Sequence, residues 1–111
     1  MSPTHRSDEN SLLRALRHPL RRRILRQLAD GETASPRELS ADLRQPLSNV
    51  SYHVRVLADC DAVTLVKARP AGGSVEHFYR STVSAPWALQ VLGQGESNRG
   101  GTGESSDGAS T

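Results

Sequence analysis

Residues 35–59, SPRELSADLRQPLSNVSYHVRVLAD, decide the fold that we expect for this chain. The first part of this stretch predicts a short helix of about two turns. Ser35 can cap the free N–H groups, Pro36 suits the first helical position, and Glu38 completes a capping box. Leu39 lies at the spacing of a side chain that faces a core.

The second part of the stretch predicts a tight turn and another helix. The turn comprises Arg44-Gln45-Pro46, and the helix runs from about Leu47 to Asp59. Val50, Val54 and Leu57 form one stripe on this helix and mark its core side. Two helices joined in this way form a helix-turn-helix motif.

Two more helices are predicted upstream. The first carries leucines at helical spacing and ends at His18, because the residue before a proline avoids the helical conformation. The second begins at Pro19 and ends at Gly31, a residue type that commonly follows a helix. The residues expected to be buried on the second helix are Leu20, Ile24, Leu25 and Leu28.

Downstream the pattern changes to that of strands. Val63–Arg69 alternates and is β-branched, Pro70–Ser74 has turn chemistry, and Val75–Arg80 returns as a second strand. Residues 86–92, PWALQVL, predict one or two further helical turns. The predicted fold is mainly α with a β-hairpin wing (α+β), a winged helix-turn-helix of order α-α-α-α-β-β plus a short C-terminal helix. The alternative is a generic small α+β domain.

Length and composition allow one domain. The chain has 111 residues, so there is no room for a second core. We expect a flexible N-terminus over residues 1–10, the winged helix-turn-helix domain over 11–92, and a disordered Gly- and Ser-rich tail over 93–111. No apolar run is long enough to span a membrane, and the first residues do not form a secretory signal, so we expect a cytoplasmic protein.

Charge is concentrated in the predicted domain. The whole chain has 14 Lys and Arg against 12 Asp and Glu, which gives a net charge of +2. Residues 11–82 hold 12 of those basic residues and 7 of the acidic ones, which gives +5. The flanks are weakly acidic. A basic domain with polar flanks favours a nucleic-acid partner.

The side of the 47–59 helix that faces away from the core is polar. Ser48, Tyr52 and Arg55 lie opposite the apolar stripe, with Asn49 and Ser51 beside them. These side chains can hydrogen-bond to base edges or phosphates, and none is too bulky to enter a major groove. As the second helix of a helix-turn-helix, this face is expected to read DNA, and the alternative is a solvated helix face.

The hairpin offers a second basic surface. Lys67 and Arg69 precede its tip, where they can reach a DNA backbone or minor groove. The alternative is a charged edge strand that prevents aggregation.

Other polar groups have less defined roles. His53 lies at the border of the core stripe, and we expect it to be at least half-buried and bonded to neighbouring backbone. Arg21, Arg22, Arg23 and Arg26 crowd the outer side of the second helix, where they can be solvated, lie near phosphates or pair with acids. Cys60 is the only cysteine, which excludes a disulfide framework and a Cys-rich zinc site.

The residues from about 13 to 82 resemble the ArsR-type winged helix-turn-helix transcriptional regulators. The stretches that carry the resemblance are HPLRRRIL (18–25), SPREL (35–39), QPLSNVSYHVRVL (45–57) and VEHFYR (75–80). The resemblance implies a homodimer on a palindromic operator, with the 47–59 helix and the wing against DNA. The metal-binding cysteines of some members are absent from 35–44, and Asp61 stands where the family usually has glycine.

The sequence therefore predicts a sequence-specific regulator of transcription, a repressor that binds double-stranded DNA without a cofactor or metal and is not an enzyme. The expected dimer contacts are Leu12, Leu13, Leu16, Trp87, Leu89 and Leu92. The alternative functions are a winged-helix module that binds another protein and not DNA, and a small hydrolase or metal enzyme.

Overall fold

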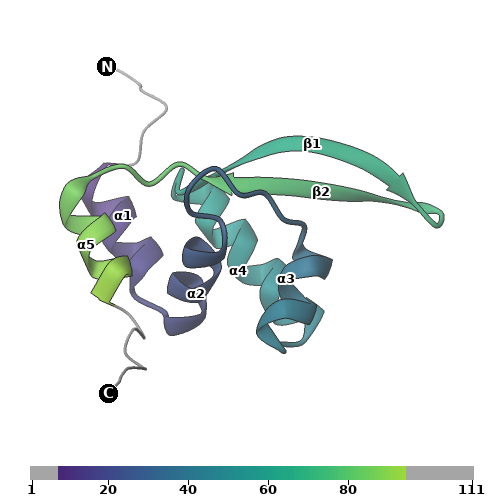
Figure 1. Ribbon diagram of the computed structural model, residues 1–111, viewed down its shortest axis with the longest axis horizontal. Coiled ribbons are helices and arrows are strands. Elements are labelled where there is room, and N and C mark those ends of the chain that lie inside the picture. The colour runs from purple at the N-terminus through teal and green to yellow at the C-terminus, as the bar shows by residue number, and fades with distance from the viewer. Residues whose placement is uncertain (1–7, 95–111) are drawn as a thin grey trace.

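The computed structural model describes residues 8–94 and confirms the predicted winged helix-turn-helix. Helices α1, α2 and α5 gather at one end, while the two-stranded wing projects past α3 and α4 at the other (Figure 1). The elements in order are α1 (Glu9–Leu16), α2 (Pro19–Gln27), α3 (Pro36–Leu43), α4 (Leu47–Asp59), β1 (Val63–Ala71), β2 (Ser74–Ser81) and α5 (Pro86–Gln94).

The outer helices extend two residues beyond the predicted 11–92 at either end. Asp8 caps α1, because its carboxylate accepts a hydrogen bond of 2.7 Å from the N–H of Ser11. Helix α5 is longer than the one or two turns expected. The rest of the predicted flanks, residues 1–7 and 95–111, lies outside the described part of the chain. No helix within residues 8–94 is long and apolar enough to cross a membrane.

Helix α2 ends earlier than its sequence predicts. It stops at Gln27, not at Gly31, and the chain then turns through positive φ at Asp30 (60°) and Gly31 (80°). Leu28 is buried, and its carbonyl accepts a hydrogen bond of 3.4 Å from the N–H of Ser81 on β2. Pairing with a distant strand therefore competes with continuation of the helix.

The wing has longer strands and a tighter turn than expected. Pro70 and Val75 pair within the ladder, and only Gly72 and Gly73 separate the strands. Both glycines have positive φ (55° and 88°), as a two-residue turn of type I′ requires. At the base of the wing, Asp61 adopts a left-handed φ of 58°, the conformation for which glycine is the usual choice.

Three of the six predicted dimer contacts are wrong. Leu12, Leu16 and Leu92 are buried in the core of this chain, so they cannot contact a second copy. The reason is that α1 and α5 each turn these leucines toward the shared apolar core, which includes α2. Leu13 and Leu89, on the outer sides of the same helices, remain about half exposed, at 47% and 48%.

The arginines of α2 donate to main-chain carbonyls near the ends of other helices. Each accepting carbonyl lies near the C-terminal end of a helix, where the last C=O groups have no partner within the helix. A cation is also favoured there by the helix dipole. Arg21 donates to Ala15 (3.2 Å) and Arg14 (3.0 Å), Arg22 to Leu16 (2.7 Å), Arg23 to Leu43 (3.3 Å) and Arg26 to Leu92 (2.7 Å).

Replacing Leu57 by alanine should lower the free energy of unfolding by about 2–5 kcal/mol, because this side chain is fully buried in α4. Leu65→Ala is the matched control: the same deletion on the exposed wing should cost within about 0.5 kcal/mol. Urea denaturation measures both. Equal losses would show that the core is placed incorrectly.

Candidate nucleic-acid interface

The outer side of α4 presents the polar residues that the sequence analysis selected. Ser48, Asn49, Tyr52 and Arg55 are exposed, and Ser51 is half-buried. Tyr52 is 56% exposed, more than Leu47 (45%), the other exposed large hydrophobic residue of this helix. The face therefore offers hydroxyl, amide and guanidinium groups to a ligand.

A short turn holds α4 against α3. Arg44 takes a left-handed conformation, with φ of 56°. The hydroxyl of Ser40 donates to the carbonyl of Gln45 over 2.6 Å, and the N–H of Gln45 donates to the carbonyl of Ser40 over 3.1 Å. These bonds close the predicted turn, so the start of α4 has a defined position relative to α3.

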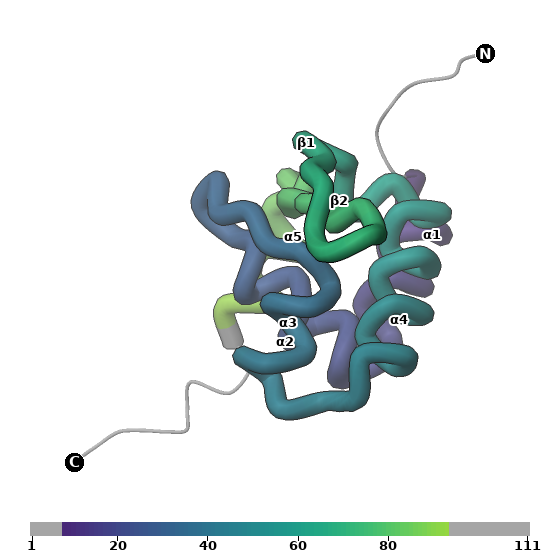
Figure 2. Tube along the Cα trace, turned by 90° about the vertical axis from the view of Figure 1, so that its right-hand side faces the viewer, coloured from purple at the N-terminus to yellow at the C-terminus, as the bar shows by residue number. Residues whose placement is uncertain are grey.

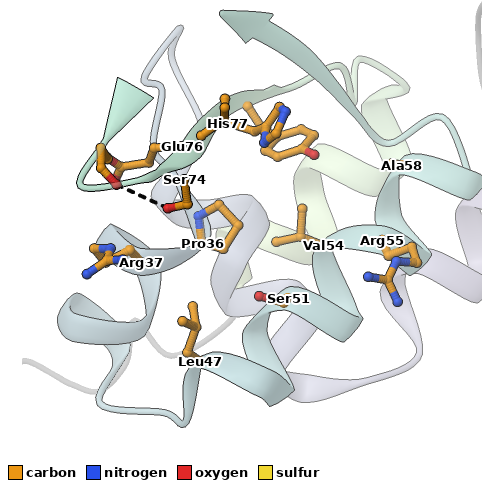
Figure 3. A pocket seen from close by; sticks show the side chains of 13 residues that line it. Pro36, Arg37, Leu47, Ser51, Val54, Arg55, Ala58, Ser74, Glu76 and His77 are labelled. Carbon is orange, nitrogen blue, oxygen red and sulfur yellow. Dashed lines mark hydrogen bonds between the residues drawn. The ribbon is translucent and has the colours of Figure 1, made fainter. Parts of the chain in front are cut away.

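A groove runs between the start of α3, the side of α4 and strand β2. Its volume is about 360 Å³, and it is open to solvent. Viewed along the wing, the hairpin lies above α3 with α4 to one side (Figure 2). Ser51 and Arg55 line the groove from α4, Arg37 from α3, and Glu76 and His77 from β2 (Figure 3).

The wing is tied to the start of α3. The Ser35 hydroxyl, which caps α3 by accepting from the N–H of Glu38 (3.1 Å), donates to the carboxylate of Glu76 (2.5 Å). The side chain of Glu38 returns a bond to the N–H of Ser35 (3.1 Å), which confirms the predicted capping box. Backbone bonds of 2.9 and 3.1 Å join Ala34 to Tyr79. The groove is therefore bounded by elements that are bonded to each other.

Lys67 and Arg69 are exposed on β1, but they do not line the groove. The Nζ atom of Lys67 and the Cζ atom of Arg69 each lie 5.0 Å from the ring centroid of the buried Phe78. Their aliphatic stems can cover this ring while the charges stay in water. Arg69 also lies 4.0 Å from Glu76.

Sequence reasoning missed Arg37 and His77 as candidate interface residues. Arg37 follows the proline at the start of α3, and His77 lies on the second strand of the wing. Nothing local distinguishes them from ordinary exposed polar residues. Their spacing from Ser51 and Arg55 along the chain does not show that all four line one groove.

His53 is buried, as expected, but its partner is a side chain and not backbone. The Nη1 atom of Arg21 lies 3.1 Å from the Nδ1 atom of His53. Burial lowers the pKa of His53 below its ordinary value of 6.5, and the neighbouring His18 and Arg21 lower it further.

Two further groups of side chains concern metal ligation and the single cysteine. Residues 8–94 hold no group of three or more His, Cys, Asp or Glu side chains that could bind a metal ion. Cys60 is buried, which agrees with the expectation of a small packed side chain.

Comparison with known proteins agrees with this geometry. A family model described as a helix-turn-helix domain matches residues 16–66. The antimony-specific transcriptional repressor AntR is 26% identical over 76% of this chain and 69% of its own, with a TM-score of 0.55. No curated protein gives a significant match.

Two other solved structures share the fold. The transcriptional repressor PagR of Bacillus anthracis is 21% identical over 78% of this chain and 90% of its own, with a TM-score of 0.55. An ArsR-family transcriptional regulator is 20% identical over 77% and 78%, with a TM-score of 0.51. These likenesses confirm the winged helix-turn-helix fold, and the family match with the likeness to AntR supports a DNA-binding regulator.

Replacing Ser35 by alanine should lower the free energy of unfolding by about 0.5–2 kcal/mol, because α3 loses its cap and Glu76 loses a donor. Ser48→Ala, on the exposed face of α4, is the control and should change stability little. Thermal and urea denaturation of the two variants decide the point. If Ser35→Ala is as stable as Ser48→Ala, the wing does not depend on this bond.

Proposed function

We propose that this DNA-binding transcriptional regulator is a repressor whose helix α4 reads the major groove. Its winged helix-turn-helix fold resembles the ArsR-type family. The observation that carries the proposal is the polar face of α4, which is exposed beside a wing bonded to α3. A repressor of this kind acts by occluding or deforming a promoter site. We propose that it acts in the cytoplasm, where it can reach its DNA target.

The proposed base contacts come from the outer side of α4. Asn49 suits adenine, and Arg55 suits guanine or a phosphate, because amides and guanidinium groups match those acceptor and donor patterns. Ser48, Ser51 and Tyr52 supply hydroxyl groups for phosphates or base edges. No ordered element covers this face in the described residues, so a duplex can approach it directly.

The groove extends the proposed contact from α4 toward the wing. Arg37 and His77 add donors to Arg55 on opposite walls, so a phosphate backbone that follows the groove meets all three. Glu76 is the acidic group in the same groove, but its carboxylate is bonded to Ser35 and lies near Arg69. These partners reduce its repulsion of a phosphate. Lys67 and Arg69 reach the adjacent backbone or minor groove from β1.

We also propose a homodimer that binds a palindromic operator. Leu13 on α1 and Leu89 and Val91 on α5 are exposed apolar residues at the end opposite the wing tip. Half-buried Trp87 lies on the same helix as the last two. A twofold axis through this end leaves both α4 helices free to enter successive major grooves, about 34 Å apart.

Arg55→Ala and Tyr52→Ala should each weaken binding to the selected operator by about 1–3 kcal/mol, because each removes a donor from the DNA-facing side of α4. Arg99→Ala, which removes the same charge within the Gly- and Ser-rich stretch, should leave operator affinity nearly unchanged. The measurement is a fluorescence-anisotropy titration against a duplex obtained by selection from genomic fragments.

Binding by the wild type should also weaken steeply with salt. A plot of log binding constant against log salt concentration should have a slope near −0.9 for each phosphate contacted. Unchanged affinity in both α4 variants would mean that another face binds DNA. If neither selected nor random duplex binds at low salt, the protein-interaction module becomes the better explanation.

Replacing Leu13 and Leu89 together by glutamate should convert the dimer to a monomer, because four like charges would enter one small apolar interface. Sedimentation velocity measures the change, and operator affinity should fall with it. Leu65→Glu changes an equally exposed leucine on the wing and should leave the dimer intact. A wild-type protein that is monomeric at high concentration would contradict the proposal.

A further inference from the structure

One buried guanidinium group joins the end of α1 to the middle of α4. Arg21 is only 9% exposed, and it donates from Nε to the carbonyl of Ala15 and from Nη2 to that of Arg14. Its remaining terminal nitrogen, Nη1, lies 3.1 Å from Nδ1 of His53. The rigid, planar guanidinium of Arg21 therefore binds both α1 and α4, and these two helices belong to different proposed interfaces.

The chemistry of arginine determines the state of His53. A guanidinium group has only donors, so the Nδ1 atom of His53 must accept the bond with its lone pair. The imidazole is then neutral, with its proton on Nε2. A protonated ring would instead point an N–H group at the guanidinium and place two positive charges 3.1 Å apart.

The surroundings of His53 also disfavour a positive charge. The His18 ring lies tilted by 39° at a centroid distance of 4.2 Å from His53, and the Tyr52 ring lies edge-on at 5.0 Å. His18 and Arg21, both from the start of α2, are the charged or titratable groups that shift the pKa of His53, and both lower it, after the larger effect of burial. Among residues 8–94, no carboxylate and no group of α3 or β1 is among the causes of this shift.

The position of His53 connects this contact to the face proposed to read DNA. Its neighbour in sequence is Tyr52, which is exposed on that face and touches the His53 ring. A displacement of His53 from Arg21 would move the α4 backbone or the Tyr52 ring. Since interiors are close-packed, α4 cannot shift there without loss of its fit against α2.

We propose that neutral His53 is a positioning residue for α4, and that its protonation breaks the contact with Arg21 and weakens DNA binding in acid. The inference rests on the proposed function, because α4 must be the DNA-facing helix. A loss of DNA binding in acid is the opposite of the usual effect, because protonation of an exposed histidine near DNA adds a favourable charge and strengthens binding. His77 lies exposed on the wing and lines the groove.

The pH window follows from the direction of the shift. The pKa of His53 in the folded protein lies below the 6.5 of the unfolded chain. The stability that neutral His53 contributes is therefore complete above pH 6.5 and is lost as the pH falls from there through the folded value. The pKa of Asp8 is lowered from 3.8, chiefly by the backbone bond from Ser11, so this carboxylate titrates below the window.

The first test compares operator affinity at about pH 7.5 and about pH 5.5 for three proteins. The wild type should lose affinity several-fold on acidification. His53→Asn keeps an acceptor near the Nδ1 position and cannot titrate, so its affinity at the higher pH should be close to wild type and its acid loss should disappear. His77→Asn, the exposed control, should lose at least as much affinity in acid as the wild type.

The second test needs no DNA and no variant. Nitrogen NMR of the imidazole groups in the wild type should show His53 with its proton on Nε2 at neutral pH and a titration midpoint below 6.5. A proton on Nδ1, a midpoint at or above 6.5, or an acid loss retained in His53→Asn would overturn the proposal. Failure of DNA binding at every pH would instead overturn the proposed function, because the NMR result does not depend on DNA.

Discussion

The arginines of α2 supply the constraint on which the arrangement of the other helices depends. A helix leaves its last carbonyls without partners, and burying them in that state costs free energy. In this protein the C-terminal ends of α1, α3 and α5 all converge on α2, whose guanidinium groups donate to them. A donor that is also a cation suits the negative end of a helix dipole. One short helix thereby sets the positions of three others.

A second, smaller set of bonds positions the wing. Ser35 begins α3 and at the same time donates to Glu76, so the residue that starts a helix also holds a strand. The polar face of α4 takes no part in either set of bonds and is left free for a ligand. Part of the +5 charge of the domain belongs to α2 arginines that bind main-chain carbonyls of other helices. The proposed DNA contacts therefore depend on a small number of other cations.

Arg21 connects the two proposed interfaces. The carbonyls that it binds lie at the end of α1, a helix proposed to face the second copy, and its third partner lies on the DNA-facing helix. Because the guanidinium is rigid and buried, a displacement of α1 or α4 moves Arg21 and so alters its contact with the other helix. A domain of this size has little room for a separate sensing pocket, and the contact with His53 gives it a way to respond to proton concentration without one.

Local signals in the sequence determined the elements and the polar face of α4. The capping box at Ser35 and the apolar stripe of α4 each act over a few neighbouring residues, so the pattern alone predicts them. Only the tertiary structure decided how the elements use their other groups. The sequence left the partners of the α2 arginines open, placed Leu12 at a dimer contact and left Arg37 unselected, because burial and shared grooves depend on residues far apart in the chain. Side-chain chemistry within one turn of helix is readable in sequence, whereas the acceptor that a long arginine finds is set by packing.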